Sequence, residues 1–224
     1  MNTLTASYIL HTRPYGNTSL ILECFTESTG RVALLARNAR GPKSRYRGQL
    51  QLFTPMMLSW SGRHELKNLN TLELHGVSLM LNQQALLCGF YMNELMMRLL
   101  HKEDPHPALL SAYDEALHTM ASANTPTALS IALRLFEKTL LHELGYGLPF
   151  SHLQSNLYYQ FRIQEGFSVC ASHDQETVFY GEDLLNISNN ALSSSSVLKA
   201  AKRLMRLALN DLLDGRPLLS RDLL

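Results

Sequence analysis

The sequence has few cysteines, the residues that form disulfides in small secreted domains and that often bind metal ions. Its three cysteines, Cys24, Cys88 and Cys170, lie far apart and form no CxxC pair. An odd number of separated cysteines argues against a disulfide framework and favours a reducing compartment. No apolar run reaches the roughly 18 residues of a membrane-spanning helix, and no basic segment precedes an apolar core at the N-terminus. We therefore expect a cytoplasmic protein with no membrane partner.

Motifs for catalysis are missing as well. The chain contains no GxxxxGK[ST] phosphate loop, no GxGxxG and no GxSxG, so the common signatures of nucleotide hydrolysis, dinucleotide binding and acyl transfer are absent. The histidines are scattered, and His142–Glu143 lacks the second histidine of an HExxH zinc motif. Glu103 and Asp104 are adjacent carboxylates, but their place before a proline indicates a helix end. The sequence predicts no enzyme, no catalytic residue, no metal and no cofactor.

What the chain does have is a core-forming composition with an uneven charge distribution. Hydrophobic residues make up 46% and charged residues 17% of the 224 positions, which is typical of a globular protein with a substantial core. The formal net charge is only +1, yet residues 1–80 carry +5, residues 81–150 carry −3 and residues 151–224 carry −1. A basic N-terminal region on a slightly acidic remainder indicates a local surface for a polyanion.

The basic region reads as a small β-barrel. Two β-rich runs joined by the turn "ESTG" predict a hairpin, and the alternation continues to about residue 76. The predicted strands cover residues 6–12, 18–26, 31–37, 52–63 and 66–76. Five short strands with one long connection favour a closed or partly open barrel, of which the OB-fold is one example.

Beyond residue 80 the apolar period changes to that of helices. Predicted helices cover roughly residues 81–104, 108–121 and 125–145, and a last one runs from about 196 to 213. Residues 150–192 indicate short strands or irregular structure. The fold class is therefore α+β: an N-terminal OB-fold barrel (1–80), an α-helical bundle (81–150) and a small mixed C-terminal portion (151–224) whose final amphipathic helix packs on the bundle.

The stretch "LARNARGPKSRYRG", residues 35–48, holds five cations and no acid. Its glycines and proline indicate a loop between the third and fourth predicted strands. Cations spread along such a loop can follow a phosphate backbone, and an aromatic ring among them offers a stacking face for a base. A solvated, mobile loop is the alternative interpretation. The candidate DNA-binding residues here are Arg37, Arg40, Lys43, Arg45, Tyr46 and Arg47.

A second basic feature lies on the last predicted helix. Lys199, Lys202, Arg203 and Arg206 recur at i, i+3, i+4 and i+7, a spacing that places four cations on one helical face. They are predicted to bind DNA, and together with the loop they would form one track if this face points toward the barrel. The alternative is an ordinary amphipathic helix with a solvated cationic face.

Several segments, in matching order, resemble the RecO family of bacterial recombination mediators. They include "RPYGNTSLILECFTESTGRVALLARNARGPKSRYRGQLQLFTPMMLSWSGR", "LRLFEKTLLHELGYGLPF" and "AKRLMRLALNDLLDGRPLLSRDLL". The resemblance implies an N-terminal OB-fold, a helical bundle, binding to single- and double-stranded DNA and annealing of complementary strands. It also implies action in the RecFOR pathway and nucleoid association. The implied partners are RecR and the C-terminal tail of the single-stranded-DNA-binding protein SSB, with help to RecA in loading onto SSB-coated DNA.

Two departures from the family pattern affect the predicted sites. Some relatives carry four cysteines as a zinc site near the C-terminus, whereas this chain has only Cys170 there, so we expect no zinc. The family pattern "LRRF" reads "LRLF" here, which keeps Arg134 and replaces the second arginine by Leu135. The resemblance implies that Arg134 grips the carboxylate end of the SSB tail. The alternative is a helix-surface arginine that pairs with Glu137 or with neighbours of Lys138. A non-catalytic OB-fold adaptor without DNA binding is the alternative function.

Overall fold

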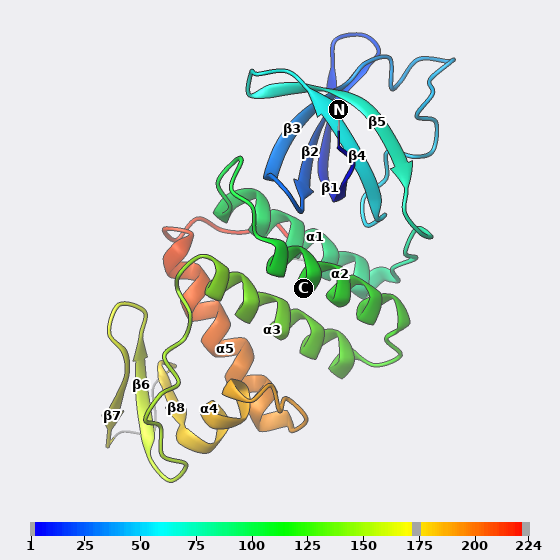
Figure 1. The fold of residues 1–224 in the computed structure, drawn as a ribbon. Coiled ribbons are helices and arrows are strands. Elements are labelled where there is room, and N and C mark those ends of the chain that lie inside the picture. Colours follow the sequence, from blue (N-terminus) through cyan, green and yellow to red (C-terminus); the bar gives the residue numbers. More distant parts are fainter. Residues whose placement is uncertain (1–2, 172–175, 221–224) are drawn as a thin grey trace. The chain divides into compact units, whose positions relative to one another are not determined.

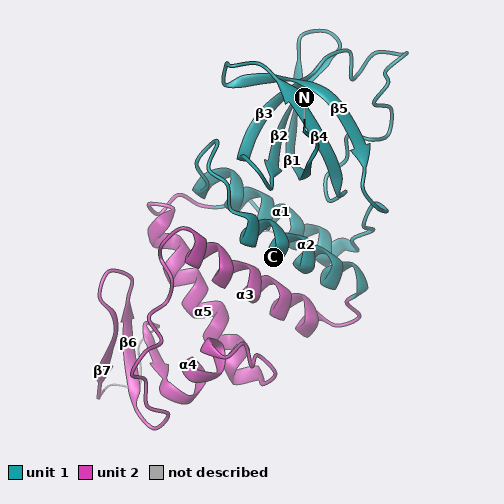
Figure 2. Ribbon diagram, in the orientation of Figure 1, with its two compact units in different colours: residues 1–122, 218–224 teal, residues 123–217 magenta. Residues whose placement is uncertain are grey.

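The computed structural model describes residues 3–171 and 176–220 of the chain and divides into two compact units. The first unit consists of the residues up to 122 together with the residues from 218 onward. The second unit consists of residues 123–217 (Figure 2). The division falls inside the region 81–150 that the sequence predicts as one bundle. Two of its three helices group with the barrel, and the third groups with the C-terminal elements.

Five strands form a closed barrel in the first unit (Figure 1). Their order around the barrel is β1-β2-β3-β5-β4, with β3 and β5 parallel and β4 closing antiparallel onto β1. This order confirms the predicted OB-fold. The strands are β1 (Thr5–Tyr15), β2 (Ser19–Thr26), β3 (Gly30–Ala36), β4 (Met56–Ser61) and β5 (Leu66–Leu74).

The barrel interior follows from the two-residue period of the strands. Alternate side chains such as Leu22 and Cys24 on β2, or Val32 and Leu34 on β3, point inward and are almost fully buried. The predicted strand 52–63 begins only at Met56. Phe53 has a φ of 58°, a left-handed conformation that bulky residues adopt rarely and that no strand continues through.

Two helices, α1 (Gln83–Leu99) and α2 (Pro107–Ser122), pack on the outer faces of β1 and β2. Asn93 of α1 donates from Nδ2 to the Leu10 carbonyl oxygen (2.9 Å) and accepts from the Tyr113 hydroxyl at Oδ1 (2.6 Å). Because buried amide groups are costly unless paired, this chain of hydrogen bonds fixes both helices to β1. Tyr8 of β1 adds an edge-to-face contact with Tyr113.

The connection between α1 and α2 also lies against the barrel. The Glu103 amide donates to the Arg31 carbonyl oxygen (3.0 Å), and the Lys67 ammonium pairs with the Glu103 carboxylate (2.5 Å). Gly30 has a φ of 71°, and a Cβ there would lie 1.8 Å from the Asp104 carbonyl oxygen. Only glycine fits this close approach.

The second unit combines three helices with a small sheet. Helix α5 packs on α3 and α4, and the sheet has the antiparallel order β7-β6-β8. The elements are α3 (Pro126–Glu143), β6 (Tyr158–Arg162), β7 (Gly166–Cys170), β8 (Val178–Tyr180), α4 (Gly181–Ser188) and α5 (Ser195–Leu212). The predicted last helix and mixed C-terminal portion are confirmed, whereas α4 lies in a region that the sequence left irregular. No helix in the described part of the chain is long and apolar enough to cross a bilayer.

Candidate nucleic-acid interface

The basic loop, defined here as residues 37–47, leaves the end of β3 and is anchored on the turn between β1 and β2. The Arg40 amide donates to the Thr18 carbonyl oxygen at 2.7 Å. Its guanidinium donates from Nη2 to the Gly16 carbonyl oxygen (2.6 Å) and from Nε to that of Ser19 (3.2 Å). Arg40 nevertheless stays exposed. It therefore holds the loop in place through neutral carbonyl groups and keeps its own positive charge at the surface.

Two further arginines attach the basic loop to β5. The Arg37 Nε donates to Asn68 Oδ1 (3.1 Å), and the Arg45 Nη2 donates to the Asn70 carbonyl oxygen (3.0 Å). The Arg45 guanidinium also lies 4.7 Å from the centre of the Tyr46 ring, a cation–π contact. As with Arg40, these partners are neutral, so the attachment leaves the charges uncompensated.

The positive charge of the basic loop is not neutralised within the described residues. Its five cations are all exposed, and none forms an ion pair with a described carboxylate. The sequence contains no Asp or Glu from residue 28 to residue 64. Lys43 and Arg47 project without an anchoring contact to any described side chain or carbonyl. Loop cations of this kind can follow a phosphate backbone.

Tyr46 does not lie at the surface of the basic loop, although the sequence predicts that it does. The residue is only 5% exposed and belongs to the buried cluster of the barrel core, together with residues such as Leu34 and Leu58. The prediction that Tyr46 offers an exposed ring for base stacking is therefore wrong. The physical reason is that side chains fill the interior of a small barrel, and Tyr46 belongs to this core while its neighbours Arg45 and Arg47 reach solvent.

An exposed aromatic lies instead on a segment for which the sequence predicts no DNA-binding residue. Tyr15, at the end of β1, is 51% exposed, and it directly precedes the Gly16 carbonyl that accepts from Arg40. Arg13, two residues earlier, points to the same side of the strand and is also exposed. The signal in the sequence is the "RPYG" run at the turn, where an aromatic side chain at a strand end has no core to enter.

The usual ligand face of an OB-fold is covered in this protein. OB-folds bind oligonucleotides across strands 2 and 3 and through the loops beside them. Here the outward side chains Ile21, Phe25 and Ala33 of β2 and β3 are buried, and Arg31 donates to the Met97 carbonyl oxygen of α1. The loop end of the barrel is not the end on which these helices pack. Figure 1 shows the β1–β2 turn at the end of the barrel away from α1 and α2.

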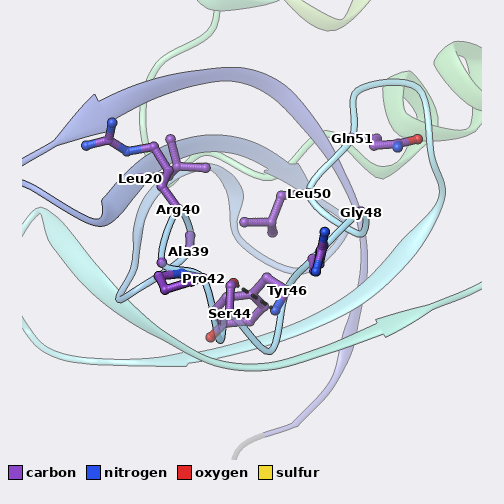
Figure 3. A pocket seen from close by; sticks show the side chains of 11 residues that line it. Leu20, Ala39, Arg40, Pro42, Ser44, Tyr46, Gly48, Leu50 and Gln51 are labelled. Atoms are coloured by element: carbon purple, nitrogen blue, oxygen red, sulfur yellow. Dashed lines mark hydrogen bonds between the residues drawn. The ribbon is translucent and has the colours of Figure 1, made fainter.

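A cavity of about 510 Å³ opens beside the basic loop. Figure 3 shows Leu50 in the middle of its lining, between Leu20 and Tyr46, with the Arg40 side chain directed away from the centre. The lining residues are Leu20, Ala39, Arg40, Gly41, Pro42, Ser44, Tyr46, Arg47, Gly48, Leu50 and Gln51. The cavity thus joins apolar walls to a cationic rim.

The cations predicted on the last helix lie on α5 in the second unit. Lys199, Lys202 and Arg206 are exposed and pair with no described carboxylate. Arg203 is engaged within the unit, because its guanidinium donates to the Val178 carbonyl oxygen and lies 4.3 Å from the Phe179 ring centre. Arg203 therefore fixes β8 to α5, and three of the four predicted cations remain available to a ligand.

Arg134, the predicted contact for the SSB tail, has an internal partner. Its Nη1 lies 3.1 Å from Oε2 of Glu137, one turn further along α3, and both side chains are buried. A buried guanidinium and carboxylate compensate each other's loss of hydration. A ligand carboxylate at Arg134 would have to share the guanidinium with Glu137.

The described residues offer no cluster that could hold a metal ion. No three His, Cys, Asp or Glu side chains come together in the chain as described. Cys170, the last residue of β7, is partly buried and forms no disulfide with a described cysteine.

Comparison with known proteins gives one consistent result. Residues 1–77 match the family model "Recombination protein O N terminal", and residues 81–154 match "Recombination protein O C terminal". "DNA repair protein RecO" of Coxiella burnetii strain CbuG_Q212 is 47% identical over 99% of this chain and 97% of its own length. The proteins of the same description from Pasteurella multocida (42%; 96% and 92%) and Haemophilus influenzae strain Rd (40%; 98% and 94%) are also similar. This chain belongs to the RecO family.

Proposed function

We propose that this protein acts in DNA repair as a non-catalytic recombination mediator of the RecFOR pathway. It binds single- and double-stranded DNA, anneals complementary strands and helps RecA to load onto single strands coated with SSB. Family membership supports the repair role, since the similar proteins carry the description "DNA repair protein RecO". The observation that carries the DNA-binding part is the basic loop: five exposed cations without a described acidic partner, on the open end of an OB-fold barrel.

Electrostatic capture accounts for annealing without ATP. Two complementary strands repel each other through their phosphates, and a cationic surface that neutralises phosphates lowers this cost and releases counterions. The exposed cations of α5 supply a second surface for the same chemistry. Base-reading helices are not needed, so we expect weak sequence preference.

The test is reversal of the two loop cations that anchor nothing. In Lys43→Glu/Arg47→Glu, affinity for single- and double-stranded DNA should fall steeply, and the slope of log affinity against log salt should decrease by about 1 for each phosphate that the protein no longer neutralises. The control Arg162→Glu/Arg216→Glu changes the net charge equally at exposed positions outside both basic surfaces. Equal DNA affinity of wild type and loop variant, with partner binding intact, would instead favour the adaptor function.

The partner proposal concerns the SSB tail, RecR and RecA. We assign the tail carboxylate to Arg134, since a guanidinium binds carboxylates in a bidentate manner and apolar residues of α3 can receive the tail's hydrophobic side chains. The double variant Arg134→Leu/Glu137→Leu removes the grip without leaving either charge facing a missing partner. It should lose binding to an SSB-tail peptide and keep binding to bare DNA. Unchanged peptide binding would remove Arg134 from the proposal.

A further inference from the structure

The cavity at the mouth of the barrel has the size of a ligand site. Its volume of about 510 Å³ falls within the roughly 300–1,000 Å³ of typical small-molecule pockets, which barrel mouths often provide. It lies between the start of β2 and the basic loop, and partly exposed apolar side chains of Leu20, Ala39 and Leu50 continue the barrel core up to its opening. An apolar surface so close to five cations is not explained by phosphate binding alone.

The lining combines the groups that a nucleobase requires. The aliphatic side chains of Leu20, Ala39 and Leu50 offer apolar contacts to the flat faces of a base. The Ser44 hydroxyl stands among them as a polar group for the edge of a base. None of the described residues that line the cavity carries a carboxylate, so these residues do not repel a phosphate.

The rim of the cavity carries positive charge. Arg40 and Arg47 both belong to the lining, and the Arg40 guanidinium is fixed on the β1–β2 turn by two carbonyl oxygens. A base held inside would therefore have guanidinium groups near its flanking phosphates. Because Arg40 is already fixed, it loses little conformational freedom when a strand binds, which favours affinity.

We propose that this cavity takes one unstacked nucleobase of single-stranded DNA. The inference rests on the proposed DNA binding and adds to it a physical basis for preferring single strands. Bases of a duplex are stacked and paired, and bringing one into the cavity requires extrusion from the helix at an energetic cost. A single strand enters without that cost, so the basic loop binds both forms while the cavity distinguishes them.

The first experiment fills the cavity without changing any charge. In full-length Ala39→Phe, affinity for a short oligothymidine should fall about 5- to 100-fold, the range expected when one base no longer stacks on the protein. Duplex affinity and the salt slope should stay at wild-type values. Ala191→Phe, the same exchange at an exposed position of the second unit, is the matched control and should bind both ligands normally.

A second experiment changes the DNA, and its first measurement uses the wild-type protein, so that measurement does not depend on how the variant folds. An oligonucleotide of abasic sites has the charge of the oligothymidine but no bases. It should bind the wild type more weakly, and Ala39→Phe should weaken abasic binding much less than it weakens oligothymidine binding, because the cavity is then already unused. Such non-additivity indicates that the base and the cavity interact directly.

The outcomes separate this inference from the proposed function. If Ala39→Phe binds oligothymidine as the wild type does, or weakens both DNA forms equally, the base-binding cavity is wrong. A cavity that serves an apolar protein side chain would give the first of these results. If the loop reversal Lys43→Glu/Arg47→Glu leaves DNA affinity unchanged, the DNA-binding function itself fails.

Discussion

The guanidinium of Arg40 donates a hydrogen bond to the carbonyl oxygen of Gly16 at 2.6 Å, which joins the basic loop to the β1–β2 turn. Lys43, three residues further along the same loop, makes no such contact to a described residue. The two cations thus differ in role although they carry the same charge. Arg40 positions the loop, and Lys43 contributes only its positive charge.

This difference predicts unequal effects of two similar truncations. Arg40→Ala should weaken single-strand binding more than Lys43→Ala does, because it removes a charge and also releases the loop from its anchor. The salt slope should change by about 1 in both variants, since each has one cation fewer. Limited proteolysis should cut the loop faster in Arg40→Ala only. Identical affinities and cleavage patterns would show that the anchor does not order the loop.

Tyr15 is the exposed aromatic that we expect to stack on a base. Tyr15→Ala should lower single-strand affinity by about 1–3 kcal/mol, the range for one base–aromatic contact, without changing the salt slope. Tyr15→Phe keeps the ring and should bind like the wild type. Fluorescence anisotropy with a labelled oligonucleotide measures both. A loss of affinity in Tyr15→Phe equal to that in Tyr15→Ala would mean that the hydroxyl group matters and stacking does not.

The buried pair of Arg134 and Glu137 predicts a non-additive effect on stability. Arg134→Ala removes the cation beside a buried carboxylate, and breaking such a pair costs about 3–5 kcal/mol. Replacing both residues by leucine should restore most of the stability, because apolar side chains of similar volume are tolerated there. Urea denaturation of the single and double variants gives the coupling energy. Additive destabilisation would show that the two charges do not depend on each other.

Glu94 makes the attachment of the chain's end sensitive to pH. Burial opposes its ionisation, but hydrogen bonds from Ser220 and Leu219 and the Arg98 guanidinium outweigh burial and lower the pKa of Glu94 below 4.5. A lowered carboxyl pKa stabilises the folded state above the unfolded pKa, and this contribution is lost as the pH falls through the folded pKa.

The stability difference between wild type and Glu94→Gln should therefore be present at neutral pH and shrink toward zero below about pH 4. Thermal unfolding at several pH values measures it. Exchange of the Ser220 amide hydrogen gives a local readout, since this amide donates to the Glu94 carboxylate. A difference that persists unchanged in acid would contradict a role for the ionised carboxylate.

The sequence alone predicted those parts of the fold that depend on the local pattern of residues. The five strands follow from alternation, and the basic loop follows from its glycines, proline and charges. It did not predict that Tyr46 is buried, because which aromatic plugs a barrel end depends on how the strands close. The same holds for the covered outer face of the barrel, since β1 and β2 pack against helices that come much later in the chain.

The helix α4 was missed for a local reason. It is eight residues long, and its first residue follows Tyr180 without a side-chain hydrogen bond to cap it. A short helix lacking a capping residue gives little signal in the sequence. The positive charge of the candidate site could be predicted from the sequence. The hydrogen bond from Arg203 to β8 and the ion pair of Arg134 with Glu137 could not, because they depend on the fold.

The chain returns to its first unit at Leu218, and this has a consequence for folding during synthesis. Leu218 is buried, and Ser220 is held by Glu94 of α1. The barrel and its helices can begin to fold while the nascent chain is still growing, but the place that Leu218 occupies is filled only after the whole segment 123–217 has been translated. A fragment that stops at residue 122 would leave this place hydrated, so a soluble isolated barrel would need the closing peptide supplied in trans or fused back onto it.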